Sequence, residues 1–127
     1  MKKYSEEHVW IATDDSNALL ATVGITVHAQ DVLGDIVFVD LPAIGAVFDA
    51  GASAGVVESV KAAADVYIPA GGTVVEVNEA LRADTALANT DPLGAGWFFK
   101  ITLTHAQELN TLMDEAAYAK YVAELSA

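Results

Sequence analysis

The sequence contains no cysteine and only six lysine and arginine residues. Without cysteine the chain can form no disulfide, no thiolate nucleophile and no cysteine metal site. No apolar run reaches the roughly 18 residues that a membrane-spanning helix requires. The first residues also lack the apolar stretch of a signal peptide. These absences predict a cytoplasmic protein that does not associate with membranes.

The charge balance is strongly acidic, because 18 aspartates and glutamates give a net charge of −12. Binding to nucleic-acid phosphates or to anionic membranes requires clustered basic side chains, so the sequence argues against both classes of partner. An acidic surface suits docking onto proteins with basic patches, where complementary charge mainly accelerates encounter. A surface that serves only solubility is the alternative interpretation.

The polar side chains form no recognisable catalytic or metal-binding pattern. The three histidines lie in separate predicted elements, and nothing in their spacing brings them together with carboxylates. The sequence has no phosphate-binding loop and no Gly-x-Ser-x-Gly elbow. Glu58 and Asp65 flank Lys61 and have the residue types of an acid–base pair, but solvated strand ends are the simpler interpretation. We therefore expect neither a metal site nor a catalytic residue.

Short apolar runs separated by turn residues predict many short strands. The expected strands are residues 8–12, 18–25, 35–41, 46–48, the segments on both sides of residue 61, 73–77 and 97–103. Helical segments are expected at residues 28–33, at 79–89, from 104 or 105 onward, and after an N-cap at Asp114. No linker divides the chain, so residues 1–127 are predicted to form a single β-rich domain.

Lys61 is the only lysine or arginine between Lys3 and Arg82. β-Branched residues lead into and out of its segment, which is typical of a β-hairpin with the lysine at its tip. A lysine that forms Schiff bases needs a desolvating pocket to lower its pKa, whereas a hairpin tip is exposed. The pattern therefore predicts an amine that is presented to another protein for covalent modification.

The segment Glu58-Ser59-Val60-Lys61-Ala62, with Asp65 after it, resembles the lipoylation site of the glycine cleavage system H-protein family. Other segments resemble the same family in the same order: His8-x-Trp10, residues 23–30, 33–42 and 75–78, Asp91-Pro92 and Gly96-Trp97. The hairpin alone is shared with lipoyl domains of 2-oxoacid dehydrogenases and with biotin carriers. A biotin carrier normally has methionine on both sides of the lysine, where Val60 and Ala62 stand here.

The resemblance implies a β-sandwich of the lipoyl/biotinyl type, a barrel-sandwich hybrid with short peripheral helices and a C-terminal helix. It implies a monomeric carrier that is not an enzyme, with lipoate attached to Lys61 through an amide bond. Glu58, Ser59, Val60 and Ala62 would then form the recognition hairpin. The swinging arm would carry the aminomethyl group of glycine from a pyridoxal phosphate-dependent glycine decarboxylase to a tetrahydrofolate-dependent aminomethyltransferase. Dihydrolipoyl dehydrogenase and a lipoate-attaching enzyme complete the implied partners.

The resemblance also implies a cleft that shelters the loaded arm. His28 and Asp65 match cleft-lining positions of the family, and Glu7 is a further candidate. Val9 and Val27 depart from the family's usual pattern, which has an acidic residue at each position. We expect Val9 to leave the arm less sheltered than a glutamate would. We expect Val27 to leave the following helical turn without its usual cap, unless Thr26 supplies one.

Two other functions remain open from the sequence. One is an H-like protein that passes lipoyl groups to other enzymes or carries another acyl group. The other is an interaction domain whose Lys61 is never modified. The intact mass of protein from lipoate-fed cells separates the unmodified domain from the two carriers. Reconstitution with the decarboxylase and the aminomethyltransferase separates the two carriers from each other.

Overall fold

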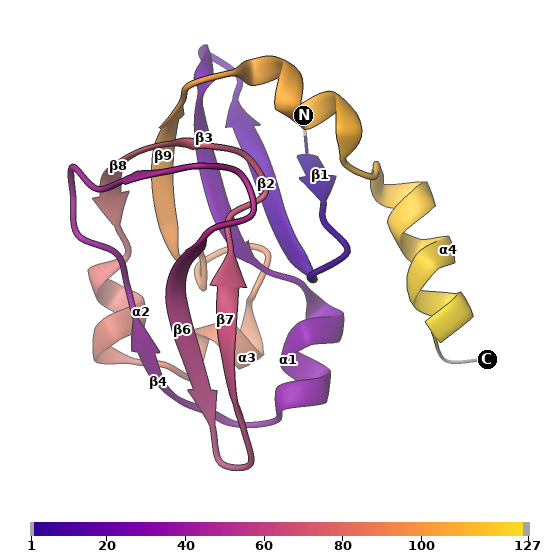
Figure 1. The fold of residues 1–127 in the computed structure, drawn as a ribbon. Helices are drawn as coiled ribbons and strands as arrows, with labels where there is room; N and C mark the ends of the chain where they lie inside the picture. Colours follow the sequence, from indigo (N-terminus) through magenta and orange to yellow (C-terminus); the bar gives the residue numbers. More distant parts are fainter. Residues whose placement is uncertain (1, 126–127) are drawn as a thin grey trace.

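The computed structural model, which describes residues 2–125, consists of two antiparallel β-sheets with short helices around them (Figure 1). The six-stranded sheet has the order β1-β2-β3-β9-β8-β5. Its strands are β1 (Lys2–Tyr4), β2 (Val9–Asp14), β3 (Asn17–Ile25), β5 (Val47–Phe48), β8 (Gly72–Val77) and β9 (Phe99–Leu103). The three-stranded sheet has the order β4-β6-β7, formed by β4 (Ile36–Asp40), β6 (Ser53–Ser59) and β7 (Ala63–Tyr67). This architecture confirms the predicted mainly β fold.

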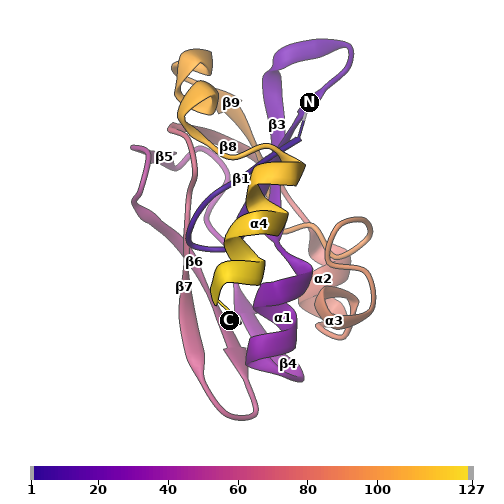
Figure 2. The ribbon, with the colours of Figure 1, turned by 90° about the vertical axis from the view of Figure 1, so that its right-hand side faces the viewer.

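The helices are short and lie at the edges of the sheets (Figures 1 and 2). They are α1 (Val27–Leu33), α2 (Glu79–Ala83), α3 (Leu87–Thr90), the 3₁₀ helix η1 (Ala106–Thr111) and α4 (Glu115–Leu125). The predicted N-cap of the last helix is confirmed, because Asp114 Oδ1 accepts a hydrogen bond from the backbone N–H of Ala117 at 2.8 Å. Within residues 2–125, no helix combines the length and the apolar character needed to cross a bilayer.

The main core lies between the two sheets and contains side chains from both of them. Its fully buried members include Ile11, Val23, Val57, Val66, Ile68, Phe98, Phe99 and Ile101. A second, smaller cluster joins Tyr4, Trp10 and Tyr118 of α4. Trp10 lies opposite Gly24, and a Cβ on Gly24 would come within 2.7 Å of the indole ring. Glycine is therefore required there for the close approach of β3 to the tryptophan.

Several predicted boundaries shift in the structure. Strand β1 was not predicted, and β2 begins at Val9 rather than at His8, because His8 has a φ of 65°. The helical segment expected at 79–89 is divided into α2 and α3. The strand expected at 97–103 begins at Phe99. Apart from the added β1 and the divided helix, the differences affect only the ends of elements, and the predicted strands follow one another in the predicted order.

Thr26 caps helix α1, so the helical turn has a cap although Val27 cannot supply one, which is the exception that the sequence left open. The Thr26 hydroxyl accepts a hydrogen bond from the backbone N–H of Ala29 at 3.2 Å, and its backbone is extended. Val27 is the first residue of the helix, and 46% of its surface is exposed. The side chain of Gln30 does not complete a capping box, because it contacts Asp31 and Asn89. The cap lies one residue earlier than the family pattern suggested.

We expect Thr26→Ala to lower the free energy of unfolding by about 1–3 kcal/mol, because it removes the cap and a buried hydrogen bond to the Tyr118 hydroxyl. Val27→Asp is the matched control. An acidic residue in the first turn gains only the interaction with the helix dipole, about 0.3–1 kcal/mol. Urea denaturation followed by circular dichroism measures both changes. An unchanged midpoint for Thr26→Ala, or a gain above that range for Val27→Asp, would contradict this assignment of the cap.

Candidate functional site

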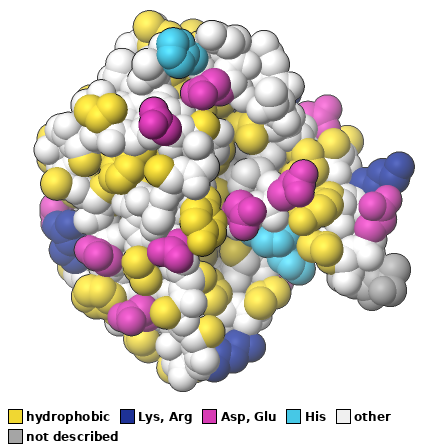
Figure 3. Space-filling view, in the orientation of Figure 1, with side chains coloured by type: hydrophobic (Ala, Val, Ile, Leu, Met, Phe, Trp, Pro, Cys, Tyr) yellow, Lys and Arg dark blue, Asp and Glu magenta, His cyan; other side chains and the backbone are white. Residues whose placement is uncertain are grey.

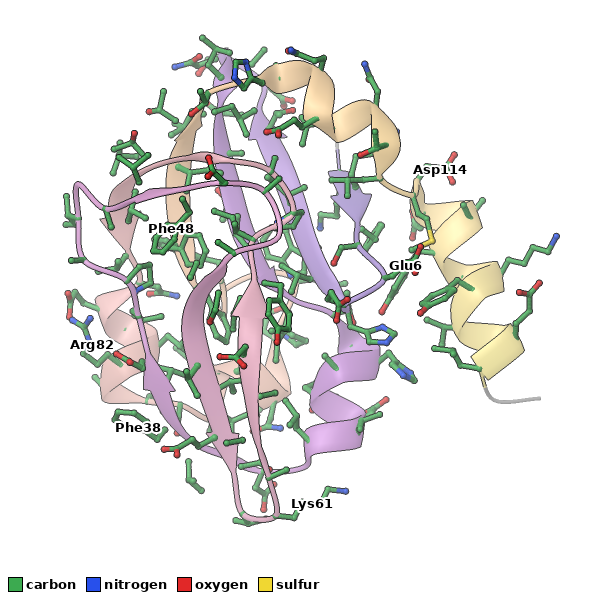
Figure 4. All side chains as sticks on the ribbon, viewed as in Figure 1. Glu6, Phe38, Phe48, Lys61, Arg82 and Asp114 are labelled. Atoms are coloured by element: carbon green, nitrogen blue, oxygen red, sulfur yellow. The ribbon has the colours of Figure 1, made fainter. Side chains whose placement is uncertain are left out.

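Strands β6 and β7 form the predicted hairpin, and residues 60–62 form its tip. The register pairs Glu58 with Ala63, and the N–H of Ser59 donates to the carbonyl of Ala62 at 2.7 Å. Lys61 is exposed at the end of the hairpin, where Figure 4 shows its side chain projecting from the lower end of the molecule. The hairpin and the position of its lysine are therefore confirmed.

The hydroxyl group of Ser59 closes the tip. It accepts hydrogen bonds from the N–H groups of Lys61 (3.3 Å) and Ala62 (3.1 Å), and it lies 3.1 Å from the carbonyl of Ala62, to which it donates. A short side chain that bonds its own turn in this way favours a fixed backbone over a mobile loop. Ser59 therefore holds the backbone of the lysine in one conformation.

The turn between α1 and β4 supports the hairpin tip from one side. The N–H of Val60 donates to the carbonyl of Asp35 at 3.1 Å. Gly34 has a φ of +79°, which other residues rarely adopt. A Cβ on Gly34 would lie 3.8 Å from Cε of Lys61, so the lysine stem passes over this glycine. The sequence predicted only a helical segment at residues 28–33 before this glycine, because the contact of Gly34 with the lysine is a tertiary one.

Lys61 makes no ion pair within residues 2–125; the structure pairs Arg82 with Glu79 and Lys100 with Glu76 instead. The neighbouring Asp35 and Glu58 are also exposed. An amine that acts as a catalyst needs a desolvating pocket, whereas this amine is open to approach by another protein. Acylation would remove its charge without breaking an ion pair.

Two side chains link the candidate cleft residues Glu7, His28 and Asp65: Glu7 and Asp65 both act on Tyr67, and Glu7 and His28 both act on His8. Asp65 Oδ1 accepts a hydrogen bond from the hydroxyl of Ser53 at 2.9 Å. The charge of Asp65 is the largest of the causes that raise the pKa of Tyr67, and the charge of Glu7 adds to it. Glu7 therefore lies near the β7 strand that carries Asp65. Figure 3 shows acidic and histidine side chains side by side on the face of the molecule that it draws.

His28 lies beside His8, and its ring centroid is 4.5 Å from that of His8. It also lines a groove of about 410 Å³ between α1 and α4, together with Val27, Leu93 and Val122. The structure thus brings Glu7 and Asp65 near Tyr67, and Glu7 and His28 near His8.

His8 is a site residue whose role the sequence did not reveal. Its Nδ1 lies 2.8 Å from the hydroxyl of Tyr118, which lies 2.7 Å from the hydroxyl of Thr26. This chain of hydrogen bonds connects the segment before β2 with α1 and α4. The backbone of His8 is left-handed, with a φ of 65°. Residues other than glycine rarely adopt this conformation, and the sequence gives no sign of it here.

The stability of the protein should depend on the protonation of His8. Burial lowers its pKa, the nearby His28 lowers it further, and Glu7 opposes the shift. A histidine with a lowered folded-state pKa contributes stability above its unfolded pKa of about 6.5, and that contribution is lost as the pH falls through the folded pKa. We expect the free energy of unfolding to fall between pH 7.5 and pH 5 less steeply in His8→Asn than in the wild type. Asparagine tolerates the left-handed backbone but does not titrate; equal pH profiles would contradict the expectation.

Val9 does not line the surface region of Glu7 and His28. Only 1% of its surface is exposed, and it belongs to the main core, where it pairs with Ile25 of β3. The expectation that Val9 governs the shelter of the arm is therefore not supported, because its side chain is packed against apolar neighbours. Its neighbour Trp10 is also buried, in the second cluster on the other face of β2.

Metal-ligating side chains do not gather in the described part of the chain: no group of three or more histidine, aspartate or glutamate side chains within residues 2–125 could hold a metal ion.

Comparisons with known proteins identify the family of the chain. The family model described as "Glycine cleavage H-protein" matches residues 2–125. The glycine cleavage system H protein of Chromobacterium violaceum is 55% identical over 120 residues, which cover 94% of this chain and 92% of the relative. That of Thermotoga maritima is 49% identical over 124 residues and 98% of each chain. The crystal structure of a glycine cleavage system H protein from Mycobacterium marinum matches with a TM-score of 0.86 at 38% identity, over 96% of each chain.

Proposed function

The chain belongs to the glycine cleavage H-protein family, and from this premise we propose that Lys61 is the residue that carries its lipoyl group. The protein is a lipoyl carrier of the glycine cleavage system, and lipoate is its cofactor. The observation that supports Lys61 is its exposed position, without an ion pair in residues 2–125, at the tip of the β6–β7 hairpin.

The residues around Lys61 fit an amide-linked lipoyl group. The dithiolane of lipoate supplies the sulfur chemistry that accepts and releases the aminomethyl group of glycine. Ser59 and the carbonyl of Asp35 hold the hairpin tip, so the root of the arm has a fixed position. A flexible arm on a fixed root gives each partner enzyme a tethered substrate at raised effective concentration. We propose that Glu58, Ser59, Val60 and Ala62 form the surface by which the hairpin is recognised.

Glu7, His28 and Asp65 are proposed to line the site that shelters the loaded arm. The aminomethyl group carries an amine, and a carboxylate binds a protonated amine through a charge-assisted hydrogen bond. Glu7 and Asp65 are the carboxylates near Tyr67, and His28 lies beside His8. The links of these residues through Tyr67 and His8 support this assignment.

A carrier protein of the glycine cleavage system must interact with the other enzymes of that system. We propose that glycine decarboxylase, the aminomethyltransferase and dihydrolipoyl dehydrogenase each receive the arm in turn, after a lipoate-attaching enzyme has acylated Lys61. The net charge of −12 favours partners with basic patches and disfavours nucleic acids and anionic membranes. The proposal includes a monomeric protein that catalyses no reaction itself. The cytoplasm is the compartment proposed for it.

Residues 1–127 are proposed to act as one domain. Both sheets contribute to one continuous hydrophobic core, with Ile11 and Phe99 from the larger sheet and Val57 and Val66 from the smaller one. A shared core couples the hairpin to the rest of the chain, and this supports a single cooperative unit.

The proposed function is tested by intact mass and by reconstitution. Protein from lipoate-fed cells should gain the mass of one lipoyl group, and peptide mapping should place it on Lys61. The lipoylated protein should then support glycine-dependent exchange of bicarbonate by glycine decarboxylase, and unmodified protein should not. A lipoylated protein that is inert in this assay would favour a role in lipoyl relay. A protein that is never acylated would favour an unmodified interaction domain.

A further inference from the structure

A β-bulge exposes two large apolar side chains beside the lysine hairpin. Strand β4 pairs Ile36 with Ser59 and Phe38 with Glu58, and the register shifts between these two pairs. Because one residue is inserted, the usual alternation of buried and exposed side chains is broken. Val37 and Phe38 are both exposed, at 56% and 52%, while Ile36 and Val39 on either side of them are buried.

These two residues belong to a larger apolar surface around the tip. Val60 is 69% exposed, and its N–H is bonded to the carbonyl of Asp35, two residues before Val37. Val32 of α1 is 56% exposed and lies two residues before Gly34, over which the Lys61 stem passes. We call Val32, Val37, Phe38 and Val60 the apolar collar. Figure 4 shows Phe38 and Lys61 at the same end of the molecule.

Exposed acidic residues accompany the apolar collar. Asp35 lies next to the tip, Glu58 pairs with Phe38, and Asp40 ends β4. Apolar side chains with a charged rim are typical of protein–protein interfaces. Because the rim is acidic and the collar lies near the amine, the complementary surface is apolar at its centre and basic at its edge. The complementary surface must also have an opening that the Lys61 side chain can enter.

We propose that the apolar collar is the docking surface of the enzyme that attaches lipoate to Lys61. This inference rests on the proposed function of Lys61. In the attachment reaction, the neutral amine attacks the carbonyl carbon of lipoyl adenylate and the amide bond forms. The bond from that carbon to the phosphate oxygen breaks, AMP leaves, and the amine proton passes to solvent.

The geometry of attachment favours this enzyme over the other partners. Reacting atoms must approach to about 3–3.5 Å, so the acyl adenylate must reach Nζ itself and the attaching enzyme must surround the tip. An enzyme that acts on the dithiolane works at the far end of the arm, a full lipoyl chain from the collar. A contact immediately around the amine therefore suits the attaching enzyme best.

The test uses the full chain in its unmodified form, purified lipoate–protein ligase, lipoate and ATP. The test variant is Val37→Thr/Phe38→Gln. The matched control is Ile44→Gln/Val47→Thr, which changes two side chains that are 66% and 70% exposed; Val47 belongs to β5 of the other sheet. Initial rates of lipoylation are followed by intact mass over a range of carrier concentrations. Thermal denaturation verifies that all variants fold.

We expect the test variant to raise KM for the carrier about tenfold, the scale of losing an apolar contact at the centre of an interface, with kcat within about twofold. The control should behave as the wild type. Once fully lipoylated by long incubation, the test variant should support glycine decarboxylase at the wild-type rate. Since the wild type is acylated in the same assay, failure of the collar is distinguished from failure of the proposed function.

Three outcomes would overturn the proposal. The first is an unchanged KM of the test variant for the ligase. The second is a loss that appears only in the decarboxylase assay, which would assign the collar to that enzyme. The third is a wild-type dimer at assay concentration that the test variant dissociates, which would assign the collar to a second copy of the chain. Size-exclusion chromatography with light scattering measures this third outcome.

Discussion

Lys61→Arg should fold as the wild type does and lose lipoylation completely. The guanidinium group remains protonated at any pH at which the protein is folded, so it offers no neutral amine for attack on an acyl adenylate. The side chain is exposed and makes no ion pair in residues 2–125, so the free energy of unfolding should change by less than about 0.5 kcal/mol. Intact mass after incubation with lipoate–protein ligase measures the first effect, and urea denaturation measures the second.

The matched control is Lys100→Arg, which changes a lysine that lies over the ring of Trp97 and faces Glu76. It should be lipoylated at the wild-type rate and should support glycine-dependent bicarbonate exchange. Lys61→Arg should give only the background rate of the decarboxylase in that assay. A lipoyl-sized mass addition on Lys61→Arg would assign the modification to another lysine and would reject the role of the hairpin.

The hairpin could be predicted because its signals are local. β-Branched residues flank the tip, and Lys61 is the only cation over a long stretch of sequence. The apolar collar could not be predicted in this way. The sequence of β4 gives no indication that the alternation breaks between Ile36 and Phe38, because a bulge depends on the register with β6. Val37 and Phe38 are exposed because of the way in which β4 pairs with β6, and the sequence of β4 alone does not determine that pairing.

The expectations for residues 9 and 27 show a second limit of sequence comparison. An unusual residue at a familiar position identifies a difference but not its surroundings. Val27 is exposed at the start of α1, where Thr26 already supplies the cap, so its departure from the pattern has little structural consequence. Val9 is buried in the core, so a valine instead of an acidic residue at this position changes the packing of the core. The two valines therefore have different structural consequences, which depend on whether each side chain is buried or exposed.

The second large effect is expected from Val9→Glu, which should destabilise the protein by about 3–5 kcal/mol near neutral pH, the range of an uncompensated buried charge. Val9 is 1% exposed and packs among apolar core residues. Burial raises the pKa of an introduced carboxyl above its unfolded value of about 4.3. The destabilisation should therefore be smallest below about pH 4.3 and should grow as the pH rises toward the folded pKa. Urea denaturation at pH 4.5 and pH 8 measures both the size and the direction of the effect.

Val27→Glu is the matched control, because it introduces the same charge at a valine that is 46% exposed. Its free energy of unfolding should change by less than about 1 kcal/mol, and in the favourable direction, since the carboxylate lies at the start of α1. If Val9→Glu proved as stable as the wild type at pH 8, residue 9 would have to reach solvent or a cationic partner. That result would contradict its place in the core. It would also restore position 9 as a lining of the region around Glu7 and His28, where a glutamate could bind the amine of the loaded arm.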